Sequence, residues 1–215
     1  MPTSFIFDGP TDARVTILLA HGAGAPMDSA SMNATARALA AAGLRVARFE
    51  FGYMAGRRNG VRKPPPRAET VMPEYVAAID DLGPTNGPLL IGGKSMGGRV
   101  ASMVADGLFE AGRIGGLVCL GYPFHPPGRP EQLRTRHLVG LRTPTLIVQG
   151  TRDEFGVPDE VAGYGLSPAI ELCWLEDGDH DLKPRKAISG FSTAEHLATM
   201  ARRVVEWAGH LSPSP

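Results

Sequence analysis

Cysteines are few in this chain of 215 residues, its charges balance, and none of its segments stays apolar for long. Lysine plus arginine and aspartate plus glutamate number 22 each, so the formal net charge is zero. A balanced chain presents no field that attracts nucleic acid or an anionic membrane, and we expect neither as a partner. No apolar run approaches the roughly 20 residues that a membrane-spanning helix needs.

The two cysteines, Cys119 and Cys173, each lie inside an apolar run and form neither a C-x-x-C pair nor a metal-type spacing. This pattern predicts two buried thiols in a reducing compartment rather than a disulfide. The first ten residues have no basic start and no long apolar core, which is not the pattern of a secretory signal. We therefore expect a cytoplasmic protein.

Short apolar segments alternate with segments of helical periodicity along the chain. Most of the apolar segments show no polar alternation, which is typical of parallel strands buried on both faces. This alternation predicts a mostly parallel sheet of about seven strands flanked by helices on both faces, in one α/β domain over residues 1–215 with a frayed tail at 211–215. The predicted strands are 15–20, 45–51, 88–93, 116–122, 145–150 and 170–176, and the predicted helices are 28–42, 72–82, one directly after Ser95 and one opening at Ser192.

The segment GGKSMGG at 92–98 is compatible with two chemistries. Gly-Lys-Ser ends a phosphate-binding P-loop, in which Ser95 would be a magnesium ligand. That motif needs a glycine five residues before Gly93, where the chain has Pro88. The residues between them are typical of a strand rather than of a flexible loop. The P-loop interpretation therefore fails on spacing and on context.

The other interpretation is a G-x-S-x-G nucleophile elbow, a sharp strand-to-helix turn that exposes a serine hydroxyl at the carboxyl edge of a sheet. The turn crowds its neighbours, so small residues are needed two before and two after Ser95, where Gly93 and Gly97 stand. A glycine-rich turn whose serine merely caps a helix would have the same pattern. The motif therefore needs partners elsewhere in the chain.

Those partners are expected in the order serine, acid, histidine, each in a loop after a strand. Asp153 directly follows one predicted strand, and His180 lies in the loop after the next strand. Glu154 is the alternative acid. His21 is the alternative base, although a role in stabilising its own turn fits it better. No second histidine is placed to complete a metal site at His180, so we expect neither a metal nor another cofactor.

Acyl transfer also needs hydrogen-bond donors for an oxyanion. The backbone N–H of Met96, directly after the nucleophile, is one expected donor. The other should come from the H-G-x-G turn after the predicted strand 15–20. We assign it to the N–H of Ala23, with Gly24 as the alternative.

Positive charge is concentrated in a predicted loop that contains Arg57 and Arg58 and lies on the same sheet edge as Ser95. As substrate-binding residues, they would place a guanidinium on a carboxylate, a phosphate or sugar hydroxyls. The alternative is a solvated surface run paired with Glu50 or Glu69.

With these residues the chain resembles the α/β-hydrolase superfamily over nearly its full length. More narrowly, HGAGAPMDS, GGKSMGGR and DGDHDLKPRK resemble a family of small predicted bacterial hydrolases. That family is related to the hydrolase-like subunit of the NSL histone acetyltransferase complex and, more distantly, to dienelactone hydrolases. The resemblance implies that Ser95, Asp153 and His180 form the triad, and it suggests carbohydrate ester hydrolysis as one activity. The elbow, acid, base and oxyanion loop together predict a metal-independent carboxylesterase or thioesterase that acts on small acyl compounds. Dienelactone hydrolases proper use a cysteine nucleophile, so Ser95 argues against that activity.

A non-catalytic interaction module on a hydrolase scaffold is the alternative function. A complete triad disfavours it, because a scaffold has no physical need for all three side chains. The chain is also short for this superfamily. Its first fourteen residues leave room for one edge strand near 5–7, and about twenty residues separate Tyr122 from Leu146. We therefore expect an open site without a large lid.

Overall fold

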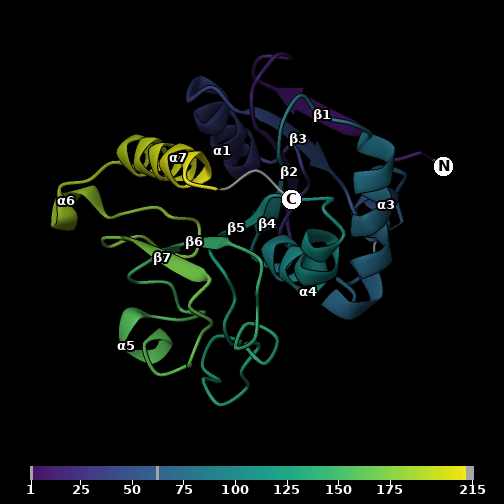
Figure 1. The fold of residues 1–215 in the computed structure, drawn as a ribbon. Helices are drawn as coiled ribbons and strands as arrows, with labels where there is room; N and C mark the ends of the chain where they lie inside the picture. The colour runs from purple at the N-terminus through teal and green to yellow at the C-terminus, as the bar shows by residue number, and fades with distance from the viewer. Residues whose placement is uncertain (1, 62, 212–215) are drawn as a thin grey trace.

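A seven-stranded sheet lies at the centre of the computed structural model, which describes residues 2–61 and 63–211. Its strands are β1 (Phe5–Asp8), β2 (Thr16–Ala20), β3 (Arg45–Phe49), β4 (Leu89–Lys94), β5 (Gly116–Leu120), β6 (Thr145–Gly150) and β7 (Ile170–Leu175). Their order is β1-β3-β2-β4-β5-β6-β7 (Figure 1), and β1 pairs antiparallel with β3 while the other pairs are parallel. The sheet confirms the predicted strands, including the single edge strand near residues 5–7.

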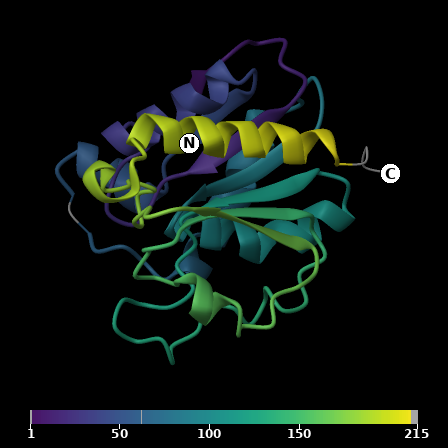
Figure 2. The same cartoon turned by 90° about the vertical axis from the view of Figure 1, so that its left-hand side faces the viewer.

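Helices cover both faces of the sheet (Figures 1 and 2). The long helices are α1 (Ala30–Ala41) and α7 (Thr193–Gly209) on one face, and α3 (Met72–Leu82) and α4 (Met96–Glu110) on the other. The short ones are α2 (Gly52–Arg58), the 3-10 helix η1 (Ala68–Val71), α5 (Pro158–Val161) and α6 (Lys186–Ser189). The arrangement is the predicted α/β class, with a mostly parallel sheet between two helical layers.

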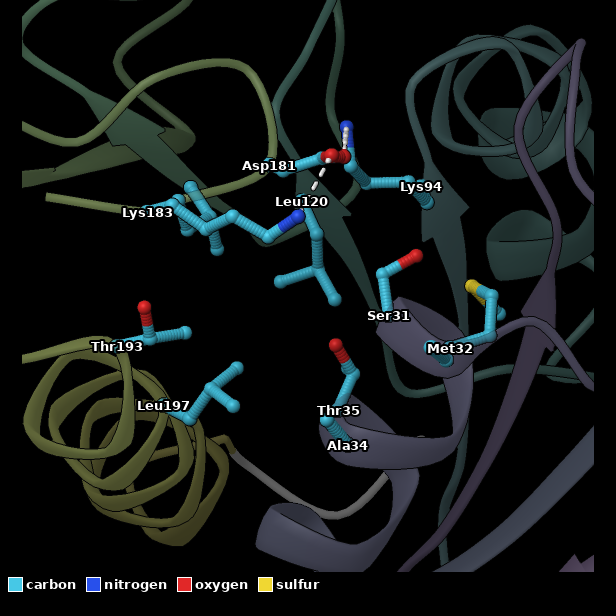
Figure 3. Close-up of a pocket in the computed structure, with 12 residues that line it drawn as sticks. Ser31, Met32, Ala34, Thr35, Lys94, Leu120, Asp181, Lys183, Thr193 and Leu197 are labelled. Atoms are coloured by element: carbon cyan, nitrogen blue, oxygen red, sulfur yellow. Dashed lines mark hydrogen bonds and ion pairs between the residues drawn. The ribbon is translucent and has the colours of Figure 1, made fainter.

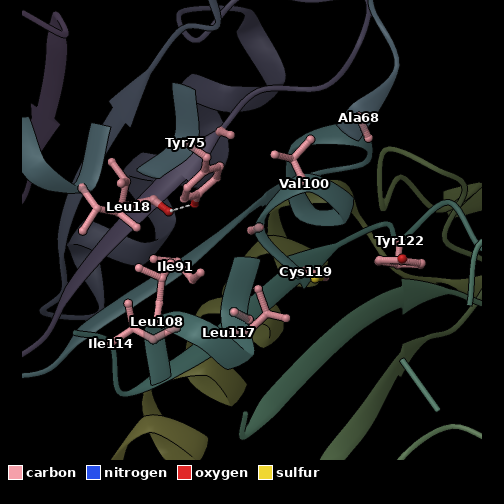
Figure 4. Packing of buried hydrophobic residues seen from close by; sticks show 14 of the residues in the cluster. Leu18, Ala68, Tyr75, Ile91, Val100, Leu108, Ile114, Leu117, Cys119 and Tyr122 are labelled. Atoms are coloured by element: carbon pink, nitrogen blue, oxygen red, sulfur yellow. Dashed lines mark hydrogen bonds between the residues drawn. The ribbon is translucent and has the colours of Figure 1, made fainter. Parts of the chain in front are cut away.

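Each face of the sheet has its own apolar core. In β2, Leu18 points toward α3 and α4, while its neighbours Ile17 and Leu19 point toward α1 and α7. Successive strand residues point to opposite faces, and here both faces are covered. The phenol of Tyr75 lies in the first of these cores, and its hydroxyl is 2.9 Å from the carbonyl oxygen of Leu18 (Figure 4). Burial on both faces accounts for strand sequences without polar alternation.

Both cysteines are core residues. Cys119 and Cys173 are buried free thiols, as predicted. Burial raises the pKa of each thiol above its ordinary value. Across residues 2–61 and 63–211, the structure contains no helix with the length and apolar character needed to cross a membrane.

The four short helices, α2, η1, α5 and α6, were not predicted, and α2 is the longest of them. The segment from Gly52 to Arg58, expected to be a loop, forms α2. Gly52 and Gly56 lower its intrinsic helix propensity, so its stability comes from tertiary contacts instead. Met54 is buried against the core, and the N–H of Gly52 donates to a carboxylate oxygen of Glu74 in α3 at 2.6 Å. Contacts of this kind are not visible in a local sequence pattern.

The long connection after β5 does not form a lid. Residues 121–144, all described, contain neither helix nor strand. These residues therefore form no separate lid of helices or strands, in agreement with the absence of a large lid that the short chain predicted. The frayed tail predicted at 211–215 falls, except for Leu211, outside the described residues.

Candidate active site

Ser95 stands at the sharp turn between β4 and α4. Its backbone angles, φ 51° and ψ −117°, belong to a region that residues with a side chain rarely adopt. A Cβ atom added at Gly93 or at Gly97 would lie 2.5 Å from the carbonyl oxygen of Ala20. Only glycine fits at both positions. This close approach to β2 is the physical reason for the G-x-S-x-G pattern.

Three side chains from the carboxyl ends of β4, β6 and β7 form a hydrogen-bonded series. His180 Nε2 lies 2.8 Å from Ser95 Oγ, and His180 Nδ1 lies 3.0 and 2.9 Å from the two carboxylate oxygens of Asp153. A proton on Nδ1, donated to the carboxylate, leaves Nε2 as an acceptor for the serine hydroxyl. Such an arrangement can take a proton from the serine and stabilise the imidazolium that results.

The carboxylate of Asp153 is completely buried and held by donors on both oxygens. Gln149 Nε2 donates to Oδ2 at 2.8 Å, and the N–H of Phe155 donates to Oδ1 at 3.0 Å. A buried carboxylate needs such partners to remain charged. Glu154, the alternative acid, is exposed to solvent. The structure thus brings Asp153, and not Glu154, to the imidazole.

His21, the alternative base, is buried and has both ring nitrogens engaged. Its Nδ1 lies 2.7 Å from the carbonyl oxygen of Gly22, and the N–H of Phe51 donates to Nε2 at 3.2 Å. Burial lowers the pKa of His21, which favours the neutral ring. The side chain therefore ties its own turn to the end of β3, in keeping with the structural role expected from the sequence.

The expected oxyanion donors lie beside Ser95. Ala23 and Met96 line the same cavity as the serine. Met96 is the first residue of α4, and the first N–H groups of a helix have no acceptor within it. The hydroxyl of Tyr53, from the unpredicted helix α2, donates to the carbonyl oxygen of Ala23 at 3.0 Å and so steadies the turn.

The side chain of Lys94 holds the loop that carries His180. Its Nζ donates to the backbone oxygen of His180 at 2.6 Å and lies 3.5 Å from Asp181 Oδ1. Figure 3 shows the carboxylate of Asp181 between Lys94 and Lys183. Burial lowers the pKa of Lys94 in spite of the neighbouring carboxylate. From its sequence pattern, this lysine was expected to have a role only in a P-loop.

Phe155 and Gln149 were also not identified from the sequence. The ring of Phe155 stacks on the imidazole of His180, with centroids 4.1 Å apart. Gln149, which holds Asp153, is completely buried in β6. A glutamine at the end of the otherwise apolar TLIVQ, four residues before the acid, is the signal that could have revealed it. For Phe155 the sequence contains no comparable signal.

Replacing Lys94 by methionine is expected to lower kcat for any ester by about 10- to 100-fold, with little change in KM. Methionine keeps the apolar stem but cannot donate to the His180 carbonyl, so the imidazole loses its fixed position. Lys183→Met is the matched control, because Lys183 Nζ pairs with the same Asp181 at 3.4 Å and is half exposed. Steady-state kinetics and melting curves of both variants test the idea, and equal losses of kcat would contradict it.

Arg58 is bound by acidic groups. It donates to both carboxylate oxygens of Glu50, at 2.8 and 2.7 Å, and to Asp28 Oδ1 at 2.8 Å. Pairing with Glu50 is the alternative that the sequence had left open. The guanidinium is therefore engaged within the protein, and the geometry gives no support to the prediction that Arg58 binds substrate.

Arg57 has weaker contacts, and its Nε is buried without a hydrogen-bond partner among the described residues. It donates to the carbonyl oxygen of Lys63 at 3.1 Å, and its guanidinium carbon lies 5.7 Å from the centroid of the Tyr53 ring. Neither Arg57 nor Arg58 occurs among the described residues that line the cavity at Ser95. Their proximity to that cavity was inferred from a loop, whereas the segment is a helix whose arginines turn to other partners.

The cavity beside Ser95 has a volume of about 590 Å³. Besides Ala23, Ser95 and Met96 it is bordered by Phe155, whose ring stacks on the imidazole of His180. The opposite side is formed by the segment 65–69 and by side chains of α4 and of the loop after β5. A molecule in this cavity would therefore contact the serine, the residues that carry both expected oxyanion donors, and Phe155 of the acid loop.

Known structures share this fold. An α/β serine hydrolase without a lid from Xanthomonas campestris matches with a TM-score of 0.68 at 19% identity, over 100% of this chain and 97% of its own. Dienelactone hydrolase from Anabaena variabilis matches with 0.70 at 21% identity, over 97% and 92%. Est1E from Butyrivibrio proteoclasticus matches with 0.68 at 14% identity, over 97% and 100%. At these identities the likeness establishes the fold alone.

Sequence comparison identifies the family. The family model of the alpha/beta hydrolase domain matches residues 13–209, a range that runs from just before β2 to the end of α7. This range includes the elbow, the acid loop and the histidine loop. The chain therefore belongs to the alpha/beta hydrolase domain family.

Proposed function

We propose that this protein is a serine hydrolase that cleaves ester or thioester bonds of small acyl compounds, carbohydrate esters being one candidate class. The observation that supports this most strongly is the hydrogen-bonded series at the sheet edge. It runs from Ser95 Oγ to His180 Nε2 over 2.8 Å and from His180 Nδ1 to the buried Asp153 over 2.9 Å. The strained elbow and the cavity beside it supply the exposed nucleophile and room for a small acyl group.

Acylation follows from these contacts. His180 Nε2 takes the hydroxyl proton as Ser95 Oγ attacks the carbonyl carbon, and Asp153 stabilises the imidazolium. The N–H groups of Ala23 and Met96 donate to the oxyanion of the tetrahedral intermediate. His180 then returns its proton to the leaving alcohol or thiol as the C–O or C–S bond breaks. An ester of Ser95 remains.

Deacylation repeats the sequence with water as the nucleophile. His180 takes a proton from the water as its oxygen attacks the acyl carbon, and then returns the proton to Ser95 Oγ as the acyl–serine bond breaks. The products are the free acid and the original enzyme. Water would reach the acyl-enzyme through the cavity beside Ser95.

Pre-steady-state kinetics with 4-nitrophenyl acetate test this function. A burst of nitrophenol equal to the enzyme concentration, followed by slower turnover, is expected when an acyl-enzyme accumulates. A panel of nitrophenyl esters and acyl thioesters of increasing chain length then defines the acyl group. A folded protein that hydrolyses none of them would support the other function, a non-catalytic interaction module.

Hydrolysis is expected to survive dialysis against a chelator. The proposed steps use only side chains and backbone N–H groups. In the described ranges 2–61 and 63–211, no three His, Cys, Asp or Glu side chains are grouped so that they could hold a metal ion. Rates of 4-nitrophenyl acetate hydrolysis before and after dialysis against EDTA provide the measurement. A loss that an added divalent metal restores would contradict the proposal.

A further inference from the structure

The cavity beside Ser95 carries an excess of positive charge. Arg67, Arg99 and Arg134 line it, and Glu69 is the one acidic side chain among the described residues that do so. The chain as a whole is neutral, with 22 basic and 22 acidic residues. The charge at this cavity is therefore a local concentration within a balanced protein.

Arg99 lies one helical turn beyond the nucleophile. Its N–H donates to the carbonyl oxygen of Ser95 at 3.0 Å, so it follows the serine by about 5.4 Å along α4. Its guanidinium donates to Glu69 at 2.8 Å, but its Nε is buried without a hydrogen-bond partner in the described part of the chain. The side chain of Glu69 is 51% exposed and that of Arg99 21%, so solvent screens this ion pair from the Glu69 side. A carboxylate already binds here, and an incoming one can replace it.

Arg134 reaches the same cavity from the loop after β5. Its backbone is fixed, since its N–H donates to Phe124 O at 2.7 Å and its carbonyl accepts from the hydroxyl of Tyr122 at 3.0 Å. Burial lowers the pKa of Arg134, and the nearby charge of Arg99 lowers it further. The carboxylate of Glu69 accepts a hydrogen bond from Arg99 and not from Arg134.

The ion pair with Glu69 offsets part of the positive charge at this cavity, but an excess remains. Two like charges that share a partly buried site repel each other and lose solvation, so they destabilise the folded protein. An anion placed between two guanidiniums removes both costs, and the planar forks of arginine match a carboxylate in particular. Two arginines that destabilise the folded protein at this cavity therefore indicate that the cavity binds an anionic ligand.

We propose that Arg99 and Arg134 form a carboxylate subsite, and that the substrate carries a carboxylate a few bonds away from its scissile ester or thioester. This inference rests on the proposed function and narrows its substrate class. It also replaces Arg57 and Arg58, which the sequence suggested for the same role. Glu69 occupies part of the subsite in the free enzyme and competes with the substrate.

Two pairs of esters test the proposal. The first pair is 4-nitrophenyl hydrogen glutarate and its neutral methyl ester, with the charge on the acyl side. The second is 4-acetoxybenzoate and its methyl ester, with the charge on the leaving group. The wild-type enzyme is expected to prefer the charged member of at least one pair in kcat/KM. Arg99→Gln and Arg134→Gln should each lower that preference by about 10- to 100-fold, the usual worth of a hydrogen bond to a charged group.

Two further variants sharpen the result. Glu69→Gln removes the competing carboxylate and should increase the preference for the charged ester. Arg136→Gln is the matched control, because Arg136 is exposed in the same loop as Arg134 and is not among the described residues that line the cavity. Its charged-to-neutral ratio should equal that of the wild type. A wild type without preference in either pair, or arginine variants with unchanged ratios, would overturn the proposal.

A binding measurement separates this subsite from the proposed function. Calorimetric titration of Ser95→Ala with the charged ester of whichever pair shows the preference needs no turnover. Binding should exceed that of the methyl ester and should be lost when Arg134→Gln is added to the same variant. A normal acyl-enzyme burst together with equal binding of both esters means that the subsite is wrong and the hydrolase proposal stands. Selective binding of the charged ester without any burst means that the subsite is right and the hydrolase proposal is wrong.

Discussion

Ser95→Ala is expected to lower kcat for 4-nitrophenyl acetate by about 10⁶-fold, the loss typical of removing a nucleophile that acts together with its base. Alanine removes the oxygen that forms the acyl-enzyme, and His180 cannot substitute for it. What remains is the smaller contribution of the oxyanion donors and of substrate binding.

The same change should leave the fold intact. Alanine keeps the Cβ atom of the strained position, and the hydroxyl that is lost contacts His180 Nε2 at 2.8 Å. The melting temperature should therefore stay within a few degrees of the wild type, as for most substitutions that create neither a cavity nor a buried unpaired charge. Ser189→Ala, in the short helix α6, serves as the control and should retain full activity. Activity of Ser95→Ala above about one per cent of the wild type would contradict the role of this serine.

Asp153→Asn is expected to lower kcat by about 10⁴-fold with little change in KM. The asparagine amide can present an N–H to His180 Nδ1, which forces the ring proton onto Nε2. In that tautomer the imidazole cannot accept the proton of Ser95. Kinetics at saturating 4-nitrophenyl acetate measure the effect.

Glu154→Gln is the matched control, because it makes the same chemical change at the neighbouring, exposed residue. Its turnover should equal that of the wild type. The asparagine also meets Gln149 Nε2, which donates to Oδ2 of Asp153 at 2.8 Å, so a small loss of melting temperature is expected from two facing amides. Full activity of Asp153→Asn together with inactive Glu154→Gln would show that the acid is Glu154.

Much of the fold could be predicted because its signals are local. The strands are short apolar runs covered on both faces, and helix α3 begins and ends where Pro73 and Gly83 indicate. The order of Ser95, Asp153 and His180 could be predicted for a different reason. Carboxyl ends of parallel strands meet at one edge of a sheet, so residues that follow β4, β6 and β7 must come close together.

The remaining features depend on contacts between distant segments. Helix α2 contains two glycines and is stabilised by burial of Met54 and by Glu74, which a local pattern does not show. The guanidinium of Arg58 donates to Asp28, thirty residues earlier in the chain. Arg99 and Arg134 share a cavity only because the loop after β5 folds back over the start of α4. The spacing of residues along the sequence does not predict a substrate subsite formed in this way.

Labelling with a fluorophosphonate probe, followed by peptide mass spectrometry, tests the role of Ser95 most directly. The wild-type protein should acquire one adduct, located on the peptide that contains Ser95, and Asp153→Asn should acquire it much more slowly. Ser95→Ala should acquire none. A folded wild-type protein that stays unlabelled, or an adduct on a different residue, would contradict the proposed mechanism.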